Sequence, residues 1–139
     1  MIDENNIERF VEAQADVWSG HDIALTEIEH GRKMSHWIWY IFPQLRGIGH
    51  SRRSHFYGIV DRKEAEAYLA HPILGPRLRE ISKALLANTN KSAVAILGEI
   101  DAQKVKSCMT LFDCISPNDI FSDVLDSFYN GERDNKSIV

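Results

Sequence analysis

Residues 32–44 have the sequence Arg-Lys-Met-Ser-His-Trp-Ile-Trp-Tyr-Ile-Phe-Pro-Gln, which contains two of the three tryptophans of the chain, a tyrosine, a phenylalanine, a histidine and two cations. Aromatic rings that carry polar atoms suit a half-buried, hydrated surface better than a dry core, because an indole N–H or a phenol O–H withdrawn from water must find a partner. This segment, the central motif, is therefore either the packing anchor of the fold or the wall of a site.

The central motif is expected to form a helix. Ser35 is a suitable N-cap, and Pro43 disfavours continuation of the helix beyond Phe42. A strand is the alternative, because the residues favour β-structure and periodicity cannot decide so short a segment. The next residues, 44–54, include Gly47 and Gly49 and are predicted to form an exposed, positively charged loop.

Helical periodicity extends to both sides of the central motif, with apolar residues three and four positions apart. The predicted helices cover approximately residues 7–18, 23–30, 61–71, 76–88, 92–97, 101–116 and 119–130. Their capping residues are predicted to be Asp61, Ser92, Asp101 and either Asn118 or Asp119. The sequence thus predicts an all-α fold, an irregular single-domain multihelical bundle of about seven short helices. The helical domain spans residues 1–139, and residues 132–139 are expected to be a flexible tail.

Size and composition are those of one globular domain, with 139 residues, 44% hydrophobic and 26% charged. No window approaches the roughly 18 consecutive apolar residues of a membrane span. The N-terminal residues are acidic, unlike those of a secretory signal, so a cytoplasmic location is expected. Cys108 and Cys114 are six residues apart in a predicted helix, on different sides of it, and a disulfide between them is not expected.

Charge is unevenly distributed along the chain. Residues 1–31 carry eight carboxylates and one cation, residues 32–63 carry seven cations and one carboxylate, and the remainder carries eight cations and eleven carboxylates. The basic middle segment indicates either an anion site or ion pairing with the acidic first segment. Nucleic acid is an unlikely partner, since the pI is about 5.8 and no nucleic-acid-binding motif is present.

Most catalytic and metal-binding signatures are missing from the sequence. The six histidines and two cysteines have no metal-ligand spacing, so no metal is expected. Ser35 precedes His36, but no nucleophile motif surrounds the serine, and an N-cap is the simpler interpretation. Gly47-Ile48-Gly49 lacks the further residues of a nucleotide-binding fingerprint, and no cofactor is predicted.

A looser anion site nevertheless fits the central motif and the loop after it. Glycines allow backbone N–H groups to converge, arginine and lysine attract an anion, and aromatic rings stack on planar groups. The sequence therefore predicts a pocket for a small anionic or nucleotide-like ligand. Its expected lining residues are Arg32, Lys33, His36, Trp37, Trp39, Tyr40, Gln44, His50, Ser51 and Arg52.

Catalysis in this pocket would depend on His36 or His50, because an imidazole titrates near neutral pH. The central motif contains no acidic partner for either ring, which favours binding over catalysis. Two alternatives compete with the pocket. The rings of Trp37, Trp39 and Tyr40 could form an exposed protein-interaction patch, or they could belong to the core while the arginines pair with the acidic first segment.

Several segments together resemble a bacterial family of unknown function. They are residues 10–14, 31–45, 47–51, 68–78 and 109–112. The family is the domain of unknown function family eighteen-ten, whose members are often labelled calpastatin. The resemblance implies a small, mainly helical single domain and no known activity. The inhibitor named calpastatin is largely disordered, whereas the apolar faces here predict a packed domain. Residues 18–23 look longer than the corresponding family segment.

Overall fold

The computed structural model describes residues 2–139, which form nine α-helices and one short 3₁₀ helix. The helices are α1 (Glu8–Gln14), α2 (His21–Glu29), α3 (Ile38–Ile41), α4 (Arg52–Phe56), α5 (Arg62–Ala70), α6 (Leu74–Leu86), α7 (Ala93–Leu97), α8 (Glu99–Ile115), α9 (Ile120–Tyr129) and η1 (Asn135–Ser137). The one β-type pairing within these residues is an isolated bridge between Leu45 and Ile59. The prediction of an all-α fold is confirmed, with more helices than the approximate count.

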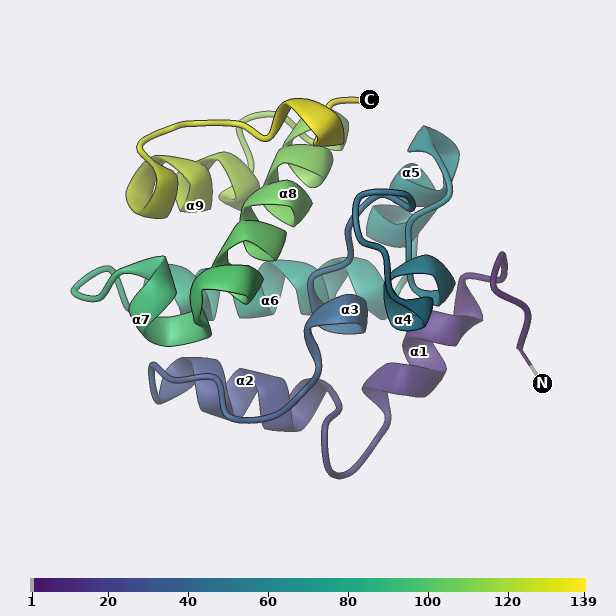
Figure 1. The fold of residues 1–139 in the computed structure, drawn as a ribbon, viewed down its shortest axis with the longest axis horizontal. Helices are drawn as coiled ribbons and strands as arrows, with labels where there is room; N and C mark the ends of the chain where they lie inside the picture. Colours follow the sequence, from purple (N-terminus) through teal and green to yellow (C-terminus); the bar gives the residue numbers. More distant parts are fainter. Residues whose placement is uncertain (1) are drawn as a thin grey trace.

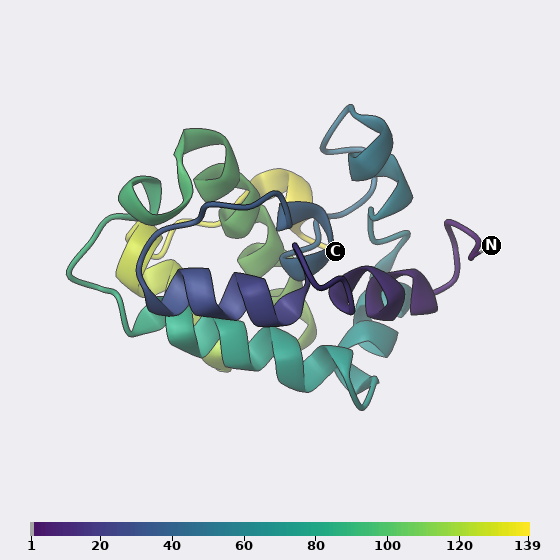
Figure 2. The ribbon, with the colours of Figure 1, turned by 90° about the horizontal axis from the view of Figure 1, so that it is seen from below.

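Two long helices organise the packing. α6 contacts α2, α5 and α9, while α8 contacts α5, α7 and α9 (Figure 1). The second view shows α2 running alongside α6 (Figure 2). Most of the largest buried side chains of the core are aromatic. They include Phe10, Trp37, Phe42, Tyr68, Phe112 and Phe121, all without exposed surface.

The central motif enters this core through its first tryptophan. Glu27 of α2 accepts hydrogen bonds from the backbone N–H groups of Met34 and Ser35 at 2.7 and 2.9 Å, and from Trp37 Nε1 at 2.9 Å. The Ser35 hydroxyl donates to the other carboxylate oxygen at 2.5 Å. Ser35 is therefore engaged by Glu27 and caps no helix, and α3 begins only at Ile38. The prediction of a Ser35 cap is wrong, because a distant carboxylate takes its hydroxyl.

The other predicted caps give mixed results. Side chains of Asp61, Ser92 and Asp119 accept backbone N–H groups at the starts of α5, α7 and α9, as expected. Asp101 is not a cap, since α8 begins two residues earlier and the Asp101 carboxylate lies 2.9 Å from Lys33 Nζ. Ser51 caps α4 within the segment that was predicted to be loop.

The first helix is shorter than predicted. α1 ends at Gln14, whose amide nitrogen donates to Tyr40 O at 2.8 Å and to the Tyr68 hydroxyl at 3.1 Å. Asp16 then turns the chain by accepting the N–H groups of Trp18 and Ser19. Trp18, which the periodicity placed on the apolar face of α1, is instead exposed to solvent.

The C-terminal segment packs on α8. Asp134 accepts the hydroxyls of Ser107 at 2.8 Å and Ser137 at 2.5 Å, and Ser137 is buried. The flexibility predicted for residues 132–139 stays a prediction. None of the helices in the described part of the chain combines the length and the apolar character that a membrane crossing requires.

Replacing Ser92 with alanine is expected to lower the free energy of unfolding by about 1 kcal/mol, because α7 loses its N-cap. The Ser92 hydroxyl oxygen accepts the N–H of Ala95 at 3.0 Å. Urea denaturation of the variant and of a Ser127→Ala control, an exposed position in α9, measures the difference. Equal effects of the two substitutions would contradict a capping role.

Candidate functional site

The ten residues predicted to line one pocket lie in different places. Trp37 is fully buried and Tyr40 is 7% exposed. Lys33 forms an ion pair with Asp101 on α8. Four of the exposed residues divide between two hollows, with His36 in one and His50, Ser51 and Arg52 in the other. The two candidate acid–base residues, His36 and His50, therefore do not share a site.

The first hollow, here the Tyr57 hollow, has a volume of about 210 Å³ and is built around the central motif. It is lined by Ala13, Asp16, Ser19, His36, Tyr40, Arg53 and Tyr57. These residues come from the end of α1, the α1–α2 loop, the central motif and α4. Two of the ten predicted site residues, His36 and Tyr40, therefore meet here with groups that the sequence did not single out.

Tyr40 ties the central motif to the α1–α2 loop. Its hydroxyl lies 2.8 Å from the carbonyl oxygen and 3.0 Å from the hydroxyl of Ser19. Its ring lies against Tyr57, with 5.2 Å between the centroids. These contacts fix two walls of the Tyr57 hollow relative to each other.

Tyr57 lines the hollow, and its hydroxyl has no hydrogen-bond partner in the described part of the chain. Its hydroxyl makes no hydrogen bond to residues 2–139, whereas that of Tyr40 does. Burial, reinforced by the neighbouring Tyr40, raises the pKa of Tyr57. The phenol therefore stays protonated at neutral pH and is available as a hydrogen-bond donor.

Arg53 is the cation of the hollow. Its guanidinium carbon lies 4.8 Å from the centroid of the Trp39 ring, and Lys104 Nζ lies 5.3 Å from the same centroid. Neither cation forms an ion pair with residues 2–139. Trp39 is thus covered by two cations, and within the same residues its Nε1 is the one buried side-chain polar atom without a hydrogen bond.

A second hollow, of about 430 Å³, contains three other predicted residues. It is lined by Glu4, His50, Ser51, Arg52, His55 and Phe56, and it shares no lining residue with the Tyr57 hollow. His55 Nε2 lies 3.3 Å from Glu4, which places a carboxylate inside this basic hollow. The remaining predicted residues, Arg32, Trp39 and Gln44, line neither hollow.

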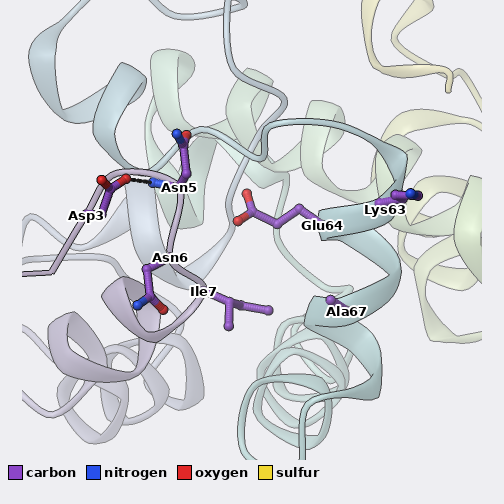
Figure 3. A pocket seen from close by; sticks show the side chains of 7 residues that line it. All are labelled: Asp3, Asn5, Asn6, Ile7, Lys63, Glu64 and Ala67. Atoms are coloured by element: carbon purple, nitrogen blue, oxygen red, sulfur yellow. Dashed lines mark hydrogen bonds between the residues drawn. The ribbon is translucent and has the colours of Figure 1, made fainter.

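A wider hollow lies between the N-terminal segment and α5 (Figure 3). Its polar walls are mostly engaged within the chain. Asp3 accepts the N–H of Asn5 at 2.7 Å, and Asn6 accepts that of Glu8 at 2.9 Å. Glu64 is held by Arg9. This hollow of about 680 Å³ therefore offers few free groups to a ligand.

Arg9 is the structural residue that the sequence analysis missed. Its guanidinium donates to both carboxylate oxygens of Glu64 at 2.8 Å, and to the carbonyls of Phe56 at 2.7 Å and Gly58 at 2.8 Å. These two carbonyls flank Tyr57, so the buried Arg9 fixes the backbone on either side of it. A single cation in an acidic segment gives no sequence signal that it is buried.

The similarity to known proteins extends over nearly the whole chain. A model of the family "Protein of unknown function (DUF1810)" matches residues 4–139. The chain belongs to this family. The solved structure of the conserved hypothetical protein Rv1873 from Mycobacterium tuberculosis is 40% identical in sequence, with a TM-score of 0.90 over 97% of this chain and 95% of that chain. None of the curated proteins matches. Membership in the DUF1810 family and its helical fold, both expected from the sequence, are confirmed.

Proposed function

We propose that this DUF1810 domain binds a small anionic ligand in the Tyr57 hollow. The observation that carries the proposal is the convergence of three groups that form no hydrogen bond or ion pair with residues 2–139: the Arg53 guanidinium, the Tyr57 hydroxyl and the exposed His36 ring. A guanidinium and a protonated phenol are hydrogen-bond donors, which suits a phosphate, sulfate or carboxylate group. The proposal keeps the aromatic and basic chemistry expected from the sequence, with Arg53 as its principal cation.

The size of the hollow limits the ligand. Pockets for drug-sized molecules are roughly 300–1,000 Å³, so about 210 Å³ suits an anionic group and little more. A neighbouring hollow of about 460 Å³ shares Ala13, Asp16 and Tyr57 with it. A nucleotide-like ligand would place its phosphate beside Arg53 and the rest of the molecule in this neighbour.

Binding is proposed in preference to catalysis. Asp16 of the α1–α2 loop lines the same hollow as His36, so an acidic group absent from the central motif is supplied from elsewhere. Its Oδ1 already accepts two backbone N–H groups of that loop. The Asp16 carboxylate and the His36 ring are not hydrogen-bonded to each other, so they do not form an acid–base pair.

The proposal is tested by thermal unfolding with inorganic phosphate, ribose 5-phosphate and adenosine monophosphate. A ligand present at a hundredfold excess over its Kd adds about 2.7 kcal/mol to stability, which raises the Tm by several degrees. Arg53→Gln is expected to abolish this rise. Arg32→Gln is the matched control, because Arg32 is also exposed and forms no ion pair but lies outside the hollow. A wild-type protein that responds to none of these compounds, or an Arg53→Gln variant that responds fully, would contradict the proposal.

A further inference from the structure

The α1–α2 loop presents two large apolar side chains to solvent. Val17 is 76% exposed and Trp18 is 83% exposed. Figure 1 shows this loop extending beyond the rest of the fold at the lower edge of the view. The rings of Trp37, Trp39 and Tyr40 are buried or partly buried, so they do not form the exposed interaction patch that the sequence suggested. Of the three tryptophans, Trp18 is the one that is exposed to solvent.

The exposure of Trp18 is fixed by the local structure. Asp16 Oδ1 accepts the N–H groups of Trp18 at 2.8 Å and Ser19 at 3.0 Å. Gly20 lies against the backbone oxygens of Gln14 and Asp16, with no room for a Cβ. A tryptophan held outward by an ordered loop loses little conformational entropy when a partner covers it, which is typical of interaction hot spots.

Carboxylates predominate on the loop itself, and two cations lie beside it. Glu12, Asp16 and Asp22 are exposed and form no ion pair with residues 2–139. Arg53 lines the Tyr57 hollow, and Lys104 lies with it against the Trp39 ring. Neither cation has a carboxylate partner among these residues. Asp16 and Arg53 line the same hollow, so the acidic and basic groups are neighbours on one surface.

Such a surface is complementary to itself. A twofold rotation about an axis between the acidic and basic groups places each group of one copy against the opposite group of the other. We propose that this surface, formed by residues 12–22 together with Arg53 and Lys104, is the interface of a symmetric dimer in which Trp18 packs against the basic group of the second copy. The indole would then gain cation–π contacts that solvent does not provide.

The charge pattern also favours a second copy of this chain over a membrane or a nucleic acid as the partner. Asp16 accepts the Trp18 N–H, and Asp22 lines a hollow together with Asp16, Val17 and Arg77. The two carboxylates outnumber the single cation of this hollow, which disfavours an anionic membrane or a nucleic-acid backbone. A second copy supplies both signs of charge in the required arrangement. The inference does not depend on the ligand proposed for the Tyr57 hollow.

Sedimentation velocity without added ligand tests the dimer from about 5 μM to about 500 μM protein, in about 50 mM and about 500 mM NaCl, since the higher salt screens exposed charges beyond a few ångströms. The wild type is expected to dimerise with rising concentration in low salt and to dissociate in high salt. Trp18→Ala and Lys104→Glu are each expected to weaken dimerisation at least tenfold. Ile138→Ala, which removes an apolar side chain that is 56% exposed in the C-terminal segment, is the matched control and is expected to behave as wild type.

Two results would overturn the inference. One is a wild-type protein that stays monomeric at the highest concentration in low salt. The other is a Trp18→Ala variant that dimerises as strongly as the wild type, which would place any interface elsewhere. Binding of anionic vesicles by the wild type that is lost in Trp18→Ala, without dimerisation, would identify a membrane as the partner instead.

Discussion

Replacing Arg9 with alanine is expected to lower the free energy of unfolding by about 3–5 kcal/mol, the cost typical of removing one partner from a buried ion pair. Arg9 is 2% exposed, and Glu64 would keep its carboxylate without a cation. The carbonyls of Phe56 and Gly58 would also lose their donor. The penalty therefore comes from stranded polar groups, in addition to the loss of the contacts themselves.

Urea denaturation monitored by circular dichroism measures this effect. Arg62→Ala is the matched control, because Arg62 pairs with Glu66 at 3.7 Å on the exposed surface of α5. Exposed pairs of this kind contribute about 0.3–0.5 kcal/mol. Similar losses for Arg9→Ala and Arg62→Ala would show that the buried pair contributes no more than an exposed one.

A double variant separates the two roles of Arg9. In Arg9→Met with Glu64→Leu, no buried charge is left unpaired, and replacing an ion pair by apolar groups is often tolerated. The carbonyls of Phe56 and Gly58 nevertheless remain without a donor. We therefore expect this variant to be more stable than Arg9→Ala and less stable than wild type. Recovery to wild-type stability would mean that the hydrogen bonds from Arg9 to the two carbonyls contribute little to stability.

The helical fold was predictable because its signals are local. Apolar spacing and capping residues such as Asp61 and Ser92 act within one or two helical turns, and these predictions hold. The failures at Ser35 and Asp101 involve contacts with another segment of the chain, Glu27 of α2 and Lys33. Ser35 was assigned as a cap because nothing in its neighbourhood reveals that Glu27 takes its hydroxyl.

The candidate site was less predictable for the same reason. The sequence places Trp37 and Trp39 two residues apart, but it does not show that Trp37 Nε1 finds a carboxylate and is thereby free to enter the core. Arg53 and Tyr57 lie outside the central motif, and only the fold brings them to His36. The residue types indicated an aromatic and basic site. Which of these side chains could contact a ligand depends on the ion pairs and hydrogen bonds that they form within the fold.

Glu27 is expected to be the position whose substitution has the second largest effect on stability. Glu27→Ala should lower the free energy of unfolding by about 2–4 kcal/mol at pH 7, because hydrogen bonds to a charged group contribute about 1.5–3 kcal/mol. Burial raises the pKa of Glu27, but the hydrogen bonds from Ser35, Met34 and Trp37 outweigh it and hold the pKa below its ordinary value of 4.5. A carboxyl whose pKa is lower in the folded state stabilises the fold above its unfolded pKa, and this contribution is lost as the pH falls through the folded value. The difference between wild type and Glu27→Gln, which removes only the charge, should therefore be larger at pH 7 than near pH 3. Urea denaturation at the two pH values measures it, with Glu29→Gln, an exposed position on the same helix, as control. A deficit of Glu27→Gln that is equal at both pH values would show that the negative charge of Glu27 does not anchor the central motif.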